Sequence, residues 1–167
     1  IAKTHNADVG VLLSDFIPAE NIPYADVGAV VEDGTIWVED RLVEELDVKR
    51  SYIEEFAEIT SNSLGMSSIG LDQNNKIKSK EAAVVASEGL GSGFREAAVA
   101  GSLLKKGFED VHIAAPFKSR NVMADIESVV DEVFYLKEIP FLSSPDSCYE
   151  KNQKNLKIED YNLQMIR

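Results

Sequence analysis

The sequence is poor in the residues that build cross-links and metal sites. It has one cysteine, Cys148, and two histidines, His5 and His112, among 167 residues. A single cysteine forms no internal disulfide, and two histidines do not make a histidine-rich metal site. We therefore expect a reducing compartment, predict a cytoplasmic protein without a metal site of its own, and assign His112 no role because a lone histidine in an apolar strand is usually a core residue.

Long apolar runs and an excess of positive charge are also missing. No stretch approaches the roughly 20 apolar residues of a membrane span, and the opening residues lack a signal-peptide pattern. We therefore expect no membrane partner. Acidic residues number 29 against 17 basic ones, a net charge of -12, which argues against a nucleic acid partner gripped through its phosphates. The chain begins with Ile1 rather than Met, which leaves open whether further residues precede it.

The hydrophobic content of the chain is sufficient to form a hydrophobic core. Hydrophobic residues make up 44% of the chain, and its length fits a single domain over residues 1–167. Strands that alternate with helical patterns predict an α/β three-layer sandwich with a mainly parallel central sheet. The strands expected from short apolar runs lie at 8–13, 82–86, 110–115 and 131–137. Residues 138–167 turn polar, and we expect them to wrap the edge of the sheet as a hood.

A β-hairpin is predicted as a flap on this sandwich. Asp33-Gly34 separates two β-prone runs, 28–31 and 35–38, and an Asp-Gly pair in that setting favours a tight turn.

The sequence also predicts three helices and contains one polar segment that is harder to interpret. Asp40 and Ser51 are expected to cap two acidic helices, and a later helix is expected over 118–129. A short strand is expected at Ser68–Leu71 in a polar segment. Lys76, Lys78 and Lys80 follow it and form either a surface turn or a steering patch for an anion.

The most ordered stretch is 81–110. The apolar run 82–86 predicts a buried strand, the sequence SEGLGSG from Ser87 to Gly93 predicts a tight loop, and helical spacing follows as far as Gly107. Such a loop directs backbone N–H groups and a helix N-terminus at one small volume, which suits a phosphate or carboxylate. Many glycine-rich turns bind nothing, so the context has to decide.

The order of these parts resembles the type I phosphoribosyltransferase family, and in particular a small microbial branch of predicted phosphoribosyltransferases, over nearly the whole chain. The resemblance lies in the Gly-Ala-Val hairpin at 28–34, in the sequence V-A-S-E-G-L-G-S-G-F-R at 85–95, and in Lys105-Lys106-Gly107 at the end of the following helix. It implies a protein of nucleotide metabolism, a transferase of the glycosyltransferase class with bound phosphoribosyl pyrophosphate and Mg²⁺.

The resemblance also implies roles for single residues. Glu88 is the carboxylate that would orient the ribose, as the catalytic residue. Phe141 is expected on the side of the base, and Tyr149 and Tyr161 would either stack there or anchor the tail. The expected phosphate-binding residues are Ser87, Gly89, Leu90, Gly91, Ser92, Gly93 and Arg95.

Two departures from the family pattern leave the activity open. Ser87 stands where the family has an aspartate, and Asp15 and Phe16 stand where it often has an Arg-Lys pair that receives pyrophosphate. One hypothesis is a phosphoribosyltransferase acting on a base. The other is a non-catalytic relative that binds a nucleotide or sugar phosphate in a regulatory role. A homodimer fits either hypothesis.

Two further interpretations of the loop have less support. A dinucleotide or adenosylmethionine loop expects an acid at the end of the second strand, whereas Glu109 and Asp110 precede the next strand. A serine hydrolase needs the G-x-S-x-G elbow, which Gly91-Ser92-Gly93 does not supply.

Overall fold

The computed structural model describes residues 7–68, 81–122, 126, 128–142, 144 and 148. The helices and strands of these residues are, in chain order, β1 (Ser14–Pro18), β2 (Asp26–Val31), β3 (Ile36–Val38), α1 (Asp40–Glu45), α2 (Arg50–Ser68), β4 (Ala82–Ala86), α3 (Phe94–Lys105), β5 (Asp110–Ser119) and β6 (Glu132–Ile139).

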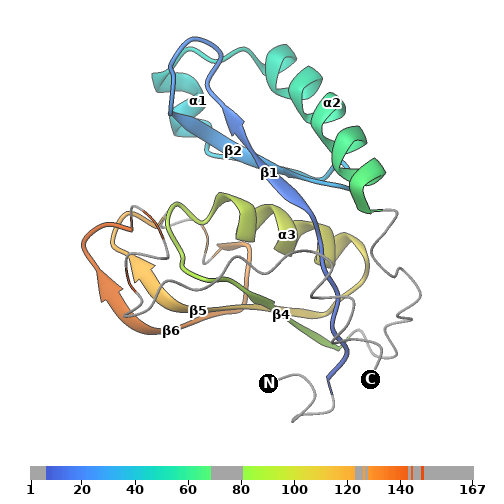
Figure 1. Cartoon of the computed structure of the whole chain (residues 1–167), viewed down its shortest axis with the longest axis vertical. Helices are drawn as coiled ribbons and strands as arrows, with labels where there is room; N and C mark the ends of the chain where they lie inside the picture. Colours follow the sequence, from blue (N-terminus) through green and yellow to red (C-terminus); the bar gives the residue numbers. More distant parts are fainter. Residues whose placement is uncertain are drawn as a thin grey trace.

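These strands form two separate sheets. Strands β1, β2 and β3 make an antiparallel sheet, and β4, β5 and β6 make a parallel one. Helix α3 lies between the two sheets, while α2 covers the far face of the antiparallel sheet (Figure 1). The predicted three-layer sandwich around one mainly parallel sheet is therefore wrong, because the strands are divided between two sheets on opposite sides of α3.

The predicted and observed folds first differ at strand β1. The predicted strand at 8–13 is not formed, and β1 occupies the next five residues instead. The loop at 19–25 is short and is closed by a hydrogen bond of 2.7 Å from Ala19 N to Ala25 O. It turns the chain straight back, so that β1 pairs antiparallel with β2. A parallel pair would have needed a long crossover, and the chain before α1 therefore builds a sheet of its own.

The predicted hairpin is formed, but it is not a flap, because β2 is the middle strand of the antiparallel sheet. Strands β2 and β3 pair antiparallel, and Gly34 takes a φ of 80° in the turn between them. The carboxylate of Asp33 accepts a hydrogen bond of 3.0 Å from Thr35 N. The two strands approach so closely at Gly28 that a Cβ there would lie 2.2 Å from Trp37 O. Only glycine fits at this point.

The helix starts differ from the predicted ones. Helix α1 begins at Asp40, and its cap is the preceding residue, Glu39, whose side chain accepts from Arg41 N at 3.3 Å. Helix α2 already includes Ser51, which is therefore not its cap. The helix continues to Ser68, where a short strand was predicted, and the rest of that predicted strand lies outside the described residues.

The predicted helix at 118–129 is also wrong. Strand β5 continues to Ser119, because Lys118 and Ser119 pair with Glu138 and Ile139 of β6. None of the described residues in 118–129 is α-helical. Strands are formed at all three positions predicted in this half, as β4, β5 and β6, with shifts at their ends. The prediction that the strand at 82–86 is buried is wrong, because β4 lies at the edge of its sheet and its residues are exposed or half-buried.

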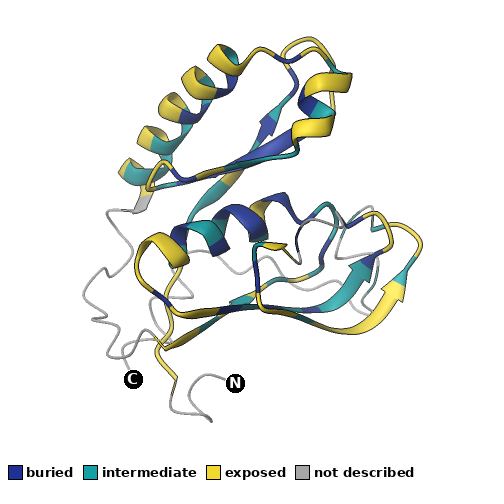
Figure 2. Cartoon of the chain, turned by 180° about the vertical axis from the view of Figure 1, so that it is seen from behind, coloured by how far each residue is buried: buried dark blue, intermediate teal, exposed yellow. Residues whose placement is uncertain are grey.

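Helix α3 has buried contacts on two sides. Its residues Ala97 and Ala100 belong to the core against the parallel sheet, whereas Phe94 and Ala98 pack against the antiparallel sheet. The ring of Phe94 stacks on Trp37 of β3, with centroids 5.6 Å apart. The burial colours show α3 mostly buried and the outer side of α2 exposed (Figure 2). The start of α3 is therefore fixed by both sheets.

Candidate functional site

The glycine loop joins β4 to α3 at the carboxyl edge of the parallel sheet. Its first half is tied to β5, because Ser87 N donates to Ala114 O at 2.9 Å and Leu90 N donates to Phe117 O at 2.8 Å. Leu90 also accepts from Ser119 N at 2.8 Å, and its side chain is fully buried. Leu90 thus anchors the loop, and its amide is already engaged within the protein.

The second half of the loop leaves its amides open. The N–H groups of Gly91, Ser92 and Gly93 make no hydrogen bond with any residue that the structure describes. Gly93 has a φ of 87° and a ψ of 0°, and it precedes the first residue of α3. These three amides therefore lie together with the positive end of the α3 dipole, which is a favourable arrangement for an anion.

The three glycines serve different purposes. A Cβ on Gly89 would lie 2.8 Å from Leu142 Cδ2, and a Cβ on Gly93 would lie 2.7 Å from Ile126 Cδ1. A Cβ on Gly91 would meet nothing within 4 Å. Packing and backbone conformation thus account for two of the glycines, and Gly91 marks the side of the loop that has space around it.

Ser87 and Glu96 close the loop with a hydrogen bond. The Ser87 hydroxyl lies 2.7 Å from Glu96 Oε1 and 3.2 Å from Gly89 O, and it also accepts from Gly89 N at 3.4 Å. Glu88, which the resemblance marks as catalytic, is exposed at the same turn. Sequence reasoning missed Glu96, although an acid three residues after Gly93 is a known signal of a helix start.

Arg95, in the first turn of α3, lies over an aromatic ring of β1. Its guanidinium lies 4.6 Å from the centre of the Phe16 ring on β1, and it makes no hydrogen bond to the loop residues 87–93. Asp26 is near enough to be affected: burial raises the pKa of Asp26, the charge of Asp15 raises it further, and the charge of Arg95 lowers it. The positive charge of Arg95 is thus shared with the antiparallel sheet.

Three more residues that the sequence analysis considered, Phe141, Cys148 and His112, are described by the structure. The side chain of Phe141 is 67% exposed just beyond β6, and Cys148 is half-buried. His112 lies within β5 next to Phe134, and its Nδ1 is buried without a partner among the described residues. Lys76, Lys78, Lys80, Tyr149, Tyr161 and most of the predicted hood lie outside the described residues.

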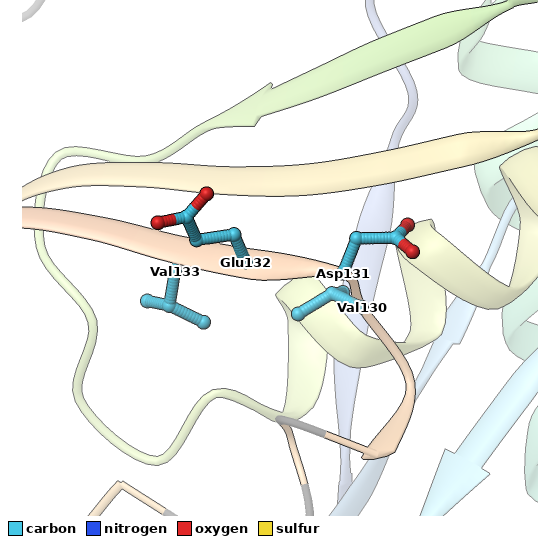
Figure 3. Close-up of a pocket in the computed structure, with 4 residues that line it drawn as sticks. All are labelled: Val130, Asp131, Glu132 and Val133. Atoms are coloured by element: carbon cyan, nitrogen blue, oxygen red, sulfur yellow. The ribbon is translucent and has the colours of Figure 1, made fainter.

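A surface hollow is present at the other edge of the parallel sheet. It is lined by Val130, Asp131, Glu132 and Val133, at the amino end of β6 (Figure 3). The Asp131 carboxylate accepts a hydrogen bond of 2.8 Å from Val111 N, so it serves to join two strands. None of the predicted site residues lines this hollow.

The described residues contain no group of three or more His, Cys, Asp or Glu side chains placed to hold a metal ion. They also contain no helix with the length and apolar character needed to cross a membrane.

Comparison with known proteins gives a likeness of fold. The chain is similar to the crystal structure of TT1426 from Thermus thermophilus, with a TM-score of 0.66 and 19% sequence identity. The match covers 95% of this chain and 76% of that one. No family model and no curated protein matches the sequence. At this identity the likeness concerns the fold alone.

Proposed function

We propose that this chain is a phosphoribosyltransferase-like protein that binds phosphoribosyl pyrophosphate, or the 5′-phosphate of a nucleotide, at the Ser87–Arg95 loop. The observation that carries the proposal is the group of unbonded amides at Gly91, Ser92 and Gly93 in front of α3. A phosphate monoester is a multiple acceptor, so it pairs with several convergent N–H groups without needing a cation.

The surroundings of the three loop glycines indicate which part of the loop a ligand can reach. Gly91 faces open space, so a ligand can approach the loop there. Gly89 and Gly93 face the side chains of Leu142 and Ile126, so they hold the loop in shape rather than admit a ligand. The phosphate would therefore sit against the second half of the loop, from Gly91 to the start of α3.

In the catalytic form of this proposal, the chain transfers a phosphoribosyl group. A nitrogen of the acceptor base forms a bond to C1 of the ribose, the bond from C1 to the pyrophosphate oxygen breaks, and pyrophosphate leaves with the electron pair. The nitrogen then loses its proton to solvent. Glu88 would orient the ribose hydroxyls. Mg²⁺ would be held mainly by the pyrophosphate oxygens, since the described residues form no three-ligand cluster.

A non-catalytic relative is the second candidate, and the surroundings of the loop favour it. Asp15 and Phe16 bring no positive charge where pyrophosphate would leave, and Arg95 lies over the Phe16 ring, where its charge acts on Asp26. A binding protein for a nucleotide or sugar phosphate needs only the amides. Labelled phosphoribosyl pyrophosphate with Mg²⁺ and a panel of bases separates the two candidates, because only the enzyme releases pyrophosphate and forms a nucleotide.

Binding itself is tested by a charge placed at the open glycine. Gly91→Glu should weaken the binding of ribose 5-phosphate by about tenfold relative to Gly91→Gln, because a carboxylate a few ångströms from the phosphate repels it. Both side chains enter open space, so both variants should fold alike. Calorimetry at low salt measures the difference. Equal affinities for the two variants, or no affinity of the wild-type chain, would refute the proposal.

A further inference from the structure

Strand β4 has one side without a neighbouring strand. It is an edge strand of the parallel sheet and pairs with β5 alone among the described residues (Figure 1). Ser87 N donates to Ala114 O of β5 at 2.9 Å, and Glu81 O accepts from Asp110 N at the same distance. Positions 81 and 87 therefore face β5. Because backbone groups alternate in direction along a strand, the N–H and C=O groups of residues 82, 84 and 86 point to the free side.

The free side of β4 lacks the features with which natural proteins protect an edge strand. All residues of β4 are alanine or valine, without a charge or a proline. They are exposed or half-buried, and Val84 in the middle is 61% exposed. The edge strand on the other side of the sheet, β6, carries Glu132, Lys137 and Glu138. Since an uncharged edge with unpaired backbone groups is a template for another strand, β4 is the edge at which a further strand would add.

We propose that the β4 strands of two copies of this chain pair antiparallel, about a twofold axis at Val84. This axis places Ala82 of one copy opposite Ala86 of the other, and Val84 opposite its own counterpart. The residues that face each other are then the ones whose N–H and C=O groups point to the free side, so these groups form hydrogen bonds between the copies. The two parallel sheets become one continuous sheet. This pairing does not depend on the proposed ligand of the loop.

The charges beside β4 in the sequence favour a second copy as the partner. Lys80 comes four residues before Val84, and Glu88 comes four residues after it. Self-pairing about Val84 therefore matches a positive charge with a negative one at both ends of the strand. Glu81 is matched with Ser87, so the register sets no two like charges opposite each other. The apolar residues of β4 are matched with those of an identical strand, and the whole segment is complementary to itself.

The dimer formed in this way is weak. Strands of this length bury well below the roughly 800 Å² per partner of a standard interface. Each chain also has a net charge of -12, which opposes association. We expect a dissociation constant on the order of 10 µM at about 0.15 M salt, where the repulsion is largely screened. The protein should therefore change from monomer to dimer as its concentration rises.

Sedimentation velocity between about 1 µM and about 200 µM tests this pairing on matched variants. Val84→Pro removes an N–H group on the free side and leaves the hydrogen bonds to β5 in place. Val84→Lys brings two like charges together at the axis. Each should raise the dissociation constant at least about tenfold. Leu136→Pro and Leu136→Lys are the controls and should leave it unchanged, because Leu136 is 89% exposed on the other edge strand, β6.

Hydrogen exchange of the segment 82–86 gives a second measurement on the wild-type chain. Its amides should exchange several-fold more slowly at the high concentration than at the low one. A wild-type monomer at about 200 µM, or a dimer that both Val84 variants retain, would overturn the proposal. Loss of the dimer in the Leu136 variants would place the interface at β6 and overturn it too. Slow exchange at every concentration would mean that this chain covers β4 itself. If Val84→Pro does not fold, Val84→Lys and the exchange measurement decide.

Discussion

The two ends of helix α3 are built in opposite ways. At its C-terminal end, Asp33 of the hairpin turn accepts from Ser102 at 2.5 Å and pairs with Lys106. At its N-terminal end, the amides of Gly91 to Gly93 make no bonds with the described residues. One end is closed by charged and buried polar groups that satisfy one another. The other end has unused hydrogen-bonding capacity, and this contrast favours a ligand at the N-terminal end.

Removing the Asp33 carboxylate at the C-terminal end of α3 should have the largest effect on stability. Asp33→Ala leaves the fully buried Ser102 hydroxyl without its acceptor, which should cost about 2 kcal/mol of unfolding free energy. Asp40→Ala is the control, because Asp40 pairs with Arg50 on the exposed surface and should cost at most about 1 kcal/mol. Urea unfolding measures both. Equal losses would mean that the Asp33 cluster is no more than a surface ion pair.

Two glycine substitutions test the packing of the loop at the N-terminal end of α3. Gly93→Ala forces alanine into a φ of 87° and against Ile126, which should cost about 1 to 2 kcal/mol. Gly91→Ala should change stability by less than about 0.5 kcal/mol, since nothing lies within 4 Å. Thermal unfolding compares the two variants. A destabilised Gly91→Ala would show that the open side of the loop is in fact packed.

The dependence of stability on acid pH tests the Asp33 cluster at the C-terminal end of α3. Burial raises the pKa of Asp33, but hydrogen bonds from Lys106, Ser102 and Thr35 together outweigh it and hold that pKa well below its ordinary value. Below about pH 4 the unfolded chain therefore binds a proton that the folded chain does not. This contribution to the unfolding free energy is present above about pH 4 and is lost as the pH falls through the folded pKa.

The variant Asp33→Asn should lack this contribution. Its unfolding free energy, followed by urea titration between about pH 5 and pH 2.5, should fall less steeply with acid than that of the wild type. Parallel curves for the two proteins would contradict the role assigned to the Lys106 and Ser102 hydrogen bonds.

The smallest effect is expected at Asp26, beside the open end. Burial and the charge of Asp15 raise the pKa of Asp26, so the folded chain prefers its neutral form and its ionisation costs stability at neutral pH. Asp26→Asn should therefore stabilise the protein by a few tenths of a kcal/mol at pH 7. Arg95→Gln removes the compensating charge and should have the opposite sign. Unfolding at two salt concentrations would check both, because salt screens them.

Local patterns predicted one half of the molecule well. The strand at 82–86, the loop after it and the helix that follows are read from a run of neighbours in sequence, and so is the Asp33-Gly34 turn. The division into two sheets was not predictable in this way. It depends on the loop at 19–25 turning back at once, and on Lys118 and Ser119 pairing with β6 rather than starting a helix.

The candidate site shows the same limit. The glycines of the loop were predicted by their spacing, but their individual purposes depend on Leu142 and Ile126, which are distant in sequence. The contact of Ser87 with Glu96 depends on side-chain orientation, and the placement of Arg95 on Phe16 depends on how the antiparallel sheet meets α3. Such contacts between separate elements leave no periodic trace in the sequence.

The stack of Trp37 on Phe94 gives the protein an internal optical reporter. Trp37 is the sole tryptophan of the chain, and its ring lies 5.6 Å from that of the residue that follows Gly93. A ligand that shifts the start of α3 would change the surroundings of this indole and hence its emission. Titrations of the loop can thus be followed by intrinsic fluorescence, with no label attached.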